Sequence, residues 1–194
     1  MKLRTLALAS SALTVTLALI GCSSTTNQAT LGSSPTSISS AAANFNDPDI
    51  AFATQMIPHH QQAVEMADLV LAKNGVDSRV TELATKIKAA QDPEIVTMTV
   101  WLKAWGQPAP VPMHGMAMNG LMSPADMDAL KNASGPDSSK LFLQQMVQHH
   151  QGAIDMAKEE LNTGKNTDAM ALAKKIVTDQ TTEIATMKIL LKSF

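Results

Sequence analysis

The sequence predicts an all-α fold in which two antiparallel helical hairpins are copies of one another. The first observation is an internal repeat: residues 52–67 align without gaps on residues 142–157, and residues 83–98 align on residues 172–187. The second is periodicity, because apolar residues in these segments recur at steps of three, four and seven, which is typical of amphipathic helices. A duplicated pair with short internal connections gives four helices, each antiparallel to its partner.

The composition indicates one domain preceded by a targeting segment. The chain has 194 residues, 45% of them hydrophobic, which is enough for one sizeable core. The formal net charge of −2 gives no reason to expect nucleic acid or an anionic membrane surface as a partner. The 13 methionines are many for this length. Since methionine usually serves as adaptable core filler, their placement decides whether they indicate anything more.

The N-terminus resembles a bacterial lipoprotein signal. A basic start and an apolar stretch over residues 6–20 lead into Leu19-Ile20-Gly21-Cys22, which is similar to the lipobox whose cysteine is lipidated. We expect residues 1–21 to be a signal peptide, Cys22 to carry a lipid anchor, and the polar residues 22–46 to form a flexible tether. Cys22 is the only cysteine, which excludes an intramolecular disulfide. Lipidation would place the protein on a membrane outside the cytoplasm; the alternative is an ordinary cleaved signal.

The first hairpin is expected over residues 47–105. Asp47-Pro48 is a good helix start, because proline suits the first helical position, and Asn74-Gly75 ends that helix. Asp77 can cap the second helix, which runs to about Trp105-Gly106.

The second hairpin is expected over residues 137–194, after a loop over residues 106–136 that is rich in proline, methionine and histidine. Ser123-Pro124 opens a short helix within this loop. The third long helix begins near Asp137 and the fourth near Thr167.

Two prolines make the copies unequal. Pro58 and Pro93 lie inside helical patterns, and each is expected to kink or locally break its helix. The second copy has Gln148 and Thr182 instead. We therefore expect the copies to present their polar side chains differently and, if they bind metal, to bind it unequally.

The histidines form two pairs, and a fifth lies in the loop. In an antiparallel hairpin, residues equally distant from the turn lie at about equal height, so imidazole, thioether, amide and carboxylate groups are expected to meet at mid-height. The predicted levels are His59 and His60 with Gln91, Met56 with Glu94, His149 and His150 with Gln180, and Met146 with Glu183. Adjacent helical residues point about 100° apart, so we expect one histidine of each pair to face the core and the other a neighbouring helix or solvent.

A cluster of thioether and imidazole groups favours copper. Thioethers prefer Cu(I), and imidazole suits both oxidation states, so Cu(I) is favoured and Cu(II) can also bind. Magnesium and calcium prefer oxygen ligands, and structural zinc usually uses cysteine. The candidate ligands are Met56, His59, His60, Met66, Glu94, Met98, His114, Met116, Met146, His149, His150, Met156, Glu183 and Met187. The candidate acceptors that would orient the imidazoles are Gln61, Gln91, Gln151 and Gln180.

Each of these features also has a purely structural interpretation that involves no metal. Buried histidine, glutamine and glutamate can satisfy one another and only specify packing. The loop Met113-His114-Gly115-Met116-Ala117-Met118, similar to the short Met/His tracts of exported copper carriers, can also be a plain surface loop. The lysines at positions 86, 88, 174 and 175 are interpreted as solvated faces.

These motifs resemble a known family. The patterns Phe-x-x-x-Met-x-x-His-His-Gln, Gln-x-x-Glu-Ile-x-x-Met and Trp-Leu-x-x-Trp-Gly are similar to domain of unknown function family 305, from about Asp47 to Phe194. The resemblance implies a ferritin-like four-helix bundle, and it implies copper, since several members look like periplasmic copper-binding proteins of the CopM type linked to copper tolerance. The second copy departs from the pattern, with Ile189-Leu190-Leu191 in place of Trp101-Leu102.

The sequence thus predicts a binding protein, not an enzyme: an anchored copper protein that buffers the ion or hands it to a delivery partner. One alternative is a redox enzyme or a haem- or copper-dependent electron-transfer bundle, although no Cys-x-x-Cys-His motif is present. The other alternative is a structural module whose histidine network serves packing alone.

Overall fold

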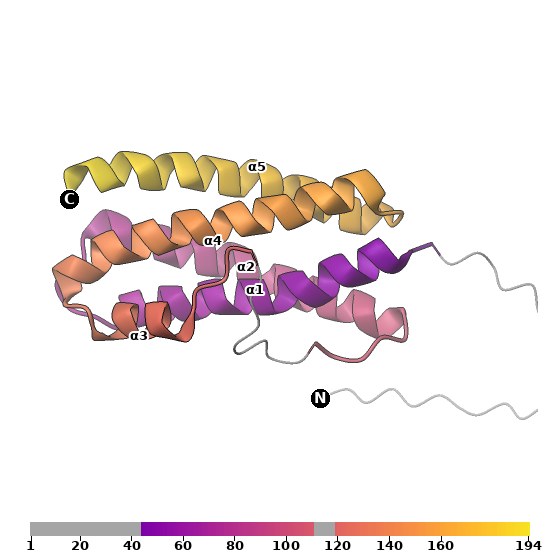
Figure 1. Ribbon diagram of the computed structural model, residues 1–194, viewed down its shortest axis with the longest axis horizontal. Coiled ribbons are helices and arrows are strands. Elements are labelled where there is room, and N and C mark those ends of the chain that lie inside the picture. The colour runs from indigo at the N-terminus through magenta and orange to yellow at the C-terminus, as the bar shows by residue number, and fades with distance from the viewer. Residues whose placement is uncertain (1–43, 111–118) are drawn as a thin grey trace, which may run out of the picture. The chain divides into compact units, whose positions relative to one another are not determined.

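The computed structural model describes residues 44–110 and 119–194, and within these ranges the chain is helical and has no β-strand (Figure 1). This confirms the predicted all-α class. The elements are α1 (Asp47–Leu71), α2 (Ser78–Ala104), α3 (Pro124–Asn132), α4 (Gly135–Thr163), α5 (Thr167–Leu190) and a terminal 3₁₀ turn, η1 (Leu191–Ser193). No helix in the described ranges is both long and apolar enough to cross a membrane. The predicted signal peptide, the lipidation site Cys22 and most of the tether lie outside the described residues.

Side-chain caps set the helix starts. Asn46 caps α1 in a reciprocal capping box with Asp49, and Asp77 caps α2 as predicted. Helix α4 begins at Gly135, two residues before the predicted start. The reason is that Ser134 is its cap and accepts a hydrogen bond from the Asp137 backbone, so Asp137 lies within the first turn.

The two prolines do not break their helices. Both α1 and α2 continue as single helices through Pro58 and Pro93, so the expected local break is wrong. Each proline lacks the N–H that would donate to the carbonyl four residues earlier. The packing of a long amphipathic helix outweighs this one missing bond, and Pro58 is itself buried in the interior.

The four long helices form a bundle in which sequential neighbours are antiparallel. Helix α1 packs on α2, α4 on α5, and α1 on α4, whereas α2 and α5 pack only thinly (Figure 1). Asn46 at the start of α1 bonds the Thr163 carbonyl at the end of α4, at 2.9 Å, so these two helices are antiparallel as well. The bundle thus pairs the two His-His-Gln helices at its centre.

A single long connection joins the hairpins. At one end Trp105 stacks on Phe45 beside the start of α1, with 5.0 Å between ring centroids. At the other end Gly135 lies against Asn74 in the turn of the first hairpin. The connection between α2 and α4 therefore runs the length of the bundle and carries α3, which is the ferritin-like arrangement with one crossover.

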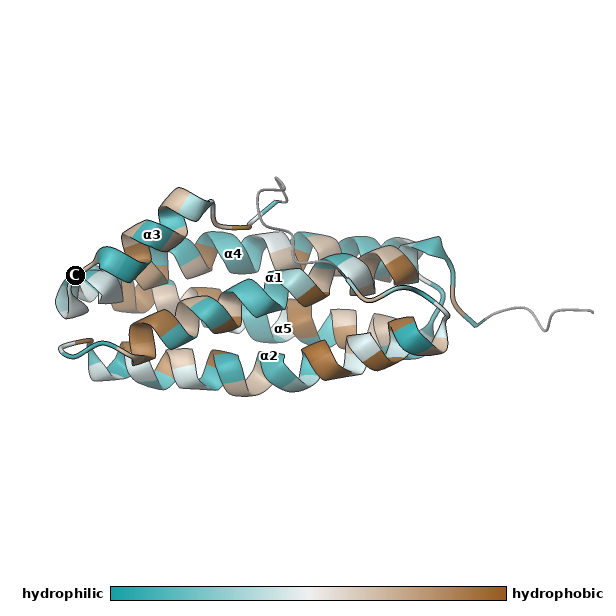
Figure 2. Cartoon of the chain, turned by 90° about the horizontal axis from the view of Figure 1, so that it is seen from below, coloured by the Kyte–Doolittle hydropathy of each residue, from teal (hydrophilic) through white to brown (hydrophobic). Residues whose placement is uncertain are grey.

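The interior consists of two apolar clusters. Hydrophobic and hydrophilic residues alternate along each helix, as expected for helices with one buried face (Figure 2). One cluster is centred on Phe142, Leu143 and Ile87, and the other on Phe52, Leu102 and Ile176. The four paired histidines belong to neither cluster, although all are fully buried.

A buried pair of carboxyl groups joins the start of α1 to the second hairpin turn. Asp49 and Glu160 are 0% and 1% exposed. Burial acts to raise the pKa of Asp49, but hydrogen bonds from Glu160 and from the backbones of Asn166, Asn46 and Lys165 lower it overall. Burial, together with the hydrogen bond to Asp49 and its charge, raises the pKa of Glu160 to about 8. With its pKa at about 8, Glu160 carries a proton at neutral pH and stands beside Asp49 as a neutral carboxyl group.

This pair predicts a pH-dependent stability. The pKa of Glu160 is raised in the folded state, so its contribution is fully present below its ordinary value of 4.5 and is lost as pH rises through about 8. Such a shift corresponds to at most about 5 kcal/mol, because water entering at the end of the bundle relieves part of the cost. Glu160→Gln keeps a neutral donor to Asp49, so chemical unfolding should show the variant gaining on the native chain from pH 5 to pH 9. A constant difference across this range would contradict the shared proton.

Candidate metal centre

Four imidazole rings form a buried polar layer at the middle of the bundle. Helix α1 supplies His59 and His60, helix α4 supplies His149 and His150, and all four are 0% exposed. Of the directions expected for each pair, His59 and His149 take the core, where they meet one another, and His60 and His150 take a neighbouring helix, α2 or α5; none of the four faces solvent. Helix α1 and helix α4 have neighbours on several sides, so two directions 100° apart both point into protein.

One histidine of each pair bonds a glutamate on the return helix of its own hairpin. His60 Nε2 lies 2.8 Å from a Glu94 carboxylate oxygen, and His150 Nε2 lies 2.6 Å from a Glu183 carboxylate oxygen. A carboxylate only accepts, so each Nε2 carries the hydrogen and donates it. Each Nδ1 is buried and without a partner, and in the neutral ring it keeps its lone pair. This carboxylate–histidine arrangement typically orients a metal ligand and raises its basicity.

The other two histidines meet across the bundle. The ring centroids of His59 and His149 are 3.8 Å apart, with 44° between the ring planes. None of their four ring nitrogens has a partner in full hydrogen-bond geometry among the described residues, although the Asn119 backbone lies near His59 and acts to raise the pKa of that ring. Burial, followed by the charges of neighbouring histidines, holds the pKa of each ring well below its usual value, so both are neutral. Neutral imidazoles can act as metal ligands, and burying them without a hydrogen-bond partner costs free energy.

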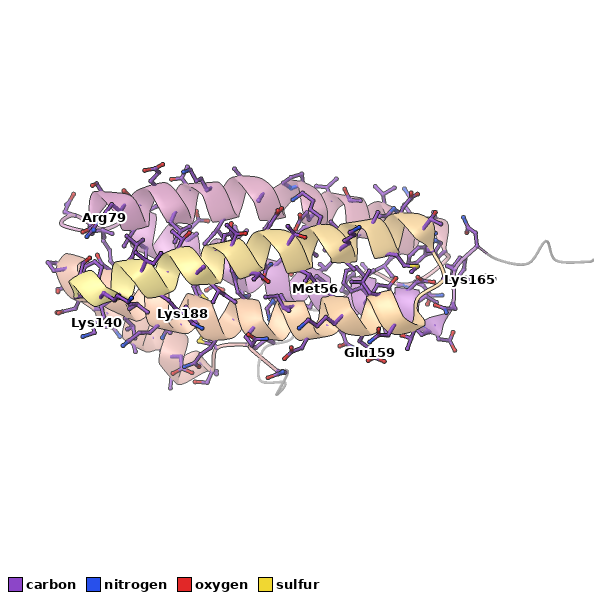
Figure 3. The ribbon with its side chains drawn as sticks, turned by 90° about the horizontal axis from the view of Figure 1, so that it is seen from above. Met56, Arg79, Lys140, Glu159, Lys165 and Lys188 are labelled. Atoms are coloured by element: carbon purple, nitrogen blue, oxygen red, sulfur yellow. The ribbon has the colours of Figure 1, made fainter. Side chains whose placement is uncertain are left out.

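Methionines lie on both sides of the histidine layer. Met56 and Met98 belong to the apolar cluster on one side, and Met146 and Met187 belong to the cluster on the other. All four are 0% exposed, and Figure 3 labels Met56 in the interior of the bundle, between the helices. Met56 and Met146 each precede a histidine pair by one helical turn. Because α1 and α4 are antiparallel, this equal spacing puts one thioether on each side of the layer.

The remaining candidates divide between interior and surface. Met66 is fully buried in the apolar cluster that holds Met146, and Met156 packs half-buried against the other cluster. Gln91 and Gln180 are buried, each with an unpartnered carbonyl oxygen, whereas Gln61 and Gln151 are exposed and are not brought to the imidazoles. His114 and Met116 lie outside the described residues.

The predicted heights were wrong by about one helical turn. His60 and His150 bond Glu94 and Glu183, not the glutamines one turn earlier. Helical side chains lean toward the N-terminus of their own helix. In an antiparallel pair this lean shifts the contacting residue on the return helix further from the turn than its Cα height indicates.

The crossover lies directly on the histidine layer, which the sequence did not reveal. Gln62 bonds both the N–H and the C=O of Met122, at 2.7 and 2.9 Å. Its counterpart in the second copy is Gly152, where an added Cβ would lie 2.2 Å from the Asn119 carbonyl oxygen and 2.7 Å from the Gly120 Cα. Gly120 itself has φ +84°. A glycine in place of the repeat's glutamine was the signal for this close approach.

A lysine interpreted as solvated also reaches the layer. Lys175 on α5 bonds Glu94 on α2 at 3.0 Å and Asp179 at 2.7 Å. Burial acts to raise the pKa of Glu94, and the hydrogen bonds and charges of His60 and Lys175 lower it overall. The glutamate is therefore a carboxylate that holds His60 on one side and Lys175 on the other.

Within the described ranges, no three histidine, cysteine, aspartate or glutamate side chains converge on one metal position. A metal in this layer would draw on ligands of another type, and methionine thioethers are the donors at hand. The sequence profile described as "Domain of unknown function (DUF305)" matches residues 49–191. The chain belongs to the DUF305 family. This family assignment and the ferritin-like fold agree with the resemblance in the sequence motifs.

Solved structures similar to this DUF305 protein share its bundle. A DUF305 protein from Streptomyces coelicolor is 34% identical, with 75% of this chain and 93% of that chain covered and a TM-score of 0.70. A DUF305 fragment from Deinococcus radiodurans is 29% identical, covering 77% and 98%, with a TM-score of 0.69. CopM in its Cu(I)-bound form is 32% identical, covering 75% and 96%, with a TM-score of 0.63. CopM is also solved in Cu(II)-bound, silver-bound and apo forms. A comparison with curated proteins gives no match.

The close approach at Gly152 predicts a specific destabilisation. Gly152→Ala places a methyl group against the Asn119–Gly120 backbone, so the crossover must move away from α4. We expect a loss of about 1 to 3 kcal/mol in the free energy of unfolding and faster proteolysis within the crossover. Gln144→Ala, an exposed change on the same helix, is the matched control and should alter stability by less than about 0.5 kcal/mol. Equal behaviour of the two variants would contradict the contact.

The neutral histidines predict a loss of stability in acid. In the unfolded chain His59 and His149 titrate near 6.5, whereas in the folded apo protein they remain neutral. Their contribution is present above pH 6.5 and is lost as pH falls toward their lowered folded pKa. The measurement uses a Glu160→Gln background, because Glu160 changes stability with pH in the opposite direction. In that background the free energy of unfolding should fall from pH 7 to pH 5. The slope should be shallower in a His59→Gln, His149→Gln variant; an unchanged slope would mean that these rings are not the buried neutral groups.

Proposed function

We propose that this DUF305 protein binds copper through imidazole and thioether groups of its central layer, and buffers the ion or passes it on. The observation that carries the proposal is the set of six imidazole nitrogens that are buried and have no hydrogen-bond partner among the described residues. Leaving a buried polar group unpartnered costs about 1 to 3 kcal/mol. A packing network would satisfy these groups, whereas a bound metal ion can use the one lone pair that each of the four neutral rings carries among them.

The donor set favours copper over other metals. Buried thioethers on both sides of the layer suit soft Cu(I), and imidazole supports either oxidation state. The nearest candidates to the imidazoles in sequence are Met56 and Met146, each one turn from a histidine pair. Glu94 and Glu183 act in this proposal by orienting His60 and His150 rather than as ligands, because one oxygen of each already accepts an imidazole hydrogen.

The comparison with CopM supports the same metal. That protein is solved with Cu(I), Cu(II) and silver, and its bundle is 29 to 32% identical to this chain. Silver ion, like Cu(I), is a soft monovalent ion, and soft ions prefer the thioether groups that lie on both sides of the layer here.

The full burial of the four histidines favours binding over catalysis. Rings that are 0% exposed leave a substrate no access to a bound ion unless the protein moves. We further propose, from the N-terminal sequence alone, that the protein is exported and anchored through a lipid on Cys22. Delivery to a partner protein is then an exchange between copper proteins outside the cytoplasm.

Copper affinity tests the proposal directly. Purified protein should compete with a chromophoric Cu(I) chelator, and a His60→Ala, His150→Ala variant should bind at least about tenfold more weakly. Gln61→Ala, Gln151→Ala is the matched control, since these neighbours are exposed, and it should bind as the native chain does. Copper should also raise the melting temperature of the native chain, because a ligand of the folded state stabilises it. No competition, or an unchanged affinity in the histidine variant, would overturn the proposal.

A further inference from the structure

The two histidine–glutamate pairs are equivalent in the repeat but differ in their surroundings. Glu94 and Glu183 occupy matching positions, and each accepts a hydrogen bond from a buried histidine. Glu94 also accepts one from Lys175 across the thin α2–α5 contact, whereas no described lysine or arginine lies within ion-pair distance of Glu183. The side chain of Glu94 is 10% exposed and that of Glu183 is 20% exposed.

The repeat explains where the difference originates. The counterpart of Lys175 in the first hairpin is Lys86, which could reach Glu183 by the same symmetry. Lys86 instead pairs with Glu82, one turn earlier on its own helix, at 2.6 Å.

The two copies of the repeat differ at two positions that explain why only Lys175 reaches a glutamate of the layer. Lys175 has Asp179 one turn later, at 2.7 Å, and the counterpart of Asp179 is Ala90. The counterpart of Glu82 is Ala171. Lys86 pairs with an acidic residue one turn before it and so lies away from the layer. Lys175 has its acidic neighbour one turn after it and also reaches Glu94.

A cation on one of the two carboxylates changes what that carboxylate does for its histidine. Lys175 neutralises part of the charge of Glu94, so Glu94 attracts the Nε2–H proton of His60 less strongly. The Nδ1 lone pair of His60 is then less basic. Lys175 also adds a positive charge near the layer, which repels a bound cation through a partly buried medium. Neither effect acts on His150, because no described lysine or arginine pairs with Glu183.

We propose that Lys175 makes the layer asymmetric, so that copper is held more tightly by its His150 side than by its His60 side. This inference rests on the proposed function and names the residue that ranks the two sides. Lys175 is a positioning residue, because it acts through Glu94 and touches no metal in this scheme. Its half-exposed side chain allows substitution without disturbing the core.

A double-mutant cycle tests the ranking. In the native background His150→Ala should cost more Cu(I) affinity than His60→Ala, and in a Lys175→Gln background the two losses should become equal to within about twofold. Lys175→Gln alone should bind copper about tenfold more tightly, and Lys175→Arg should behave as the native chain. Lys86→Gln is the matched control and should change nothing. Equal losses in the native background, or a ranking that Lys175→Gln leaves unaltered, would overturn the inference while the proposed function stood.

Two further arms make the result decisive. Glu82→Ala, Ala90→Asp gives Lys86 the acidic neighbour that Lys175 has, and it should weaken Cu(I) binding by steering Lys86 to Glu183. In the apo protein, nitrogen-15 NMR of the imidazoles should show Lys175→Gln shifting His60 and leaving His150 unchanged. The NMR measurement needs no copper, so it tests the coupling through Glu94 separately. If the native chain fails to bind copper, the proposed function is refuted. If the His60 signal does not move, the coupling through Glu94 is refuted.

Discussion

The burial of four imidazoles between two apolar clusters is the constraint on which the rest of this bundle depends. Six of the eight ring nitrogens have no partner among the described residues, and the other two donate to glutamates. Such a layer costs stability, because each unpartnered group gives up its hydration. A fold that keeps these groups out of water holds imidazole lone pairs available to a cation, and this is the physical basis of the copper proposal.

The topology follows from the need to bring two copies of one motif face to face. Helices α1 and α4 lie antiparallel at the centre, so that His59 meets His149 and each copy of the motif faces the other. The return helices α2 and α5 supply the glutamates and pack only thinly on one another. The long crossover then covers the layer by lying on α4 at Gly152 and bonding to α1 through Gln62.

Duplication gives the layer its symmetry, and a few later differences remove it. Gln62 and Gly152 occupy one repeat position, yet one bonds the crossover and the other makes room for it. Lys175 and Lys86 likewise share a position, yet only Lys175 reaches the layer. These differences, and not the histidines, distinguish the two halves.

The sequence by itself determined the helices, their caps and their pairing. Caps such as Asp77, and the gapless repeat, are local or periodic signals that act within a few residues. It also marked the chemistry-bearing residues, because His-His pairs one turn after a methionine are visible without coordinates.

Only the tertiary structure decided which groups meet. The pairing of His60 with Glu94 rather than Gln91 depends on the lean of side chains in an antiparallel pair, which residue spacing does not carry. The burial of both histidines in each pair depends on α1 and α4 having neighbours on several sides. The reach of Lys175 to Glu94 depends on a contact between α2 and α5, helices from different hairpins. Sequence patterns describe one helix or hairpin at a time, and the layer is made where four helices converge.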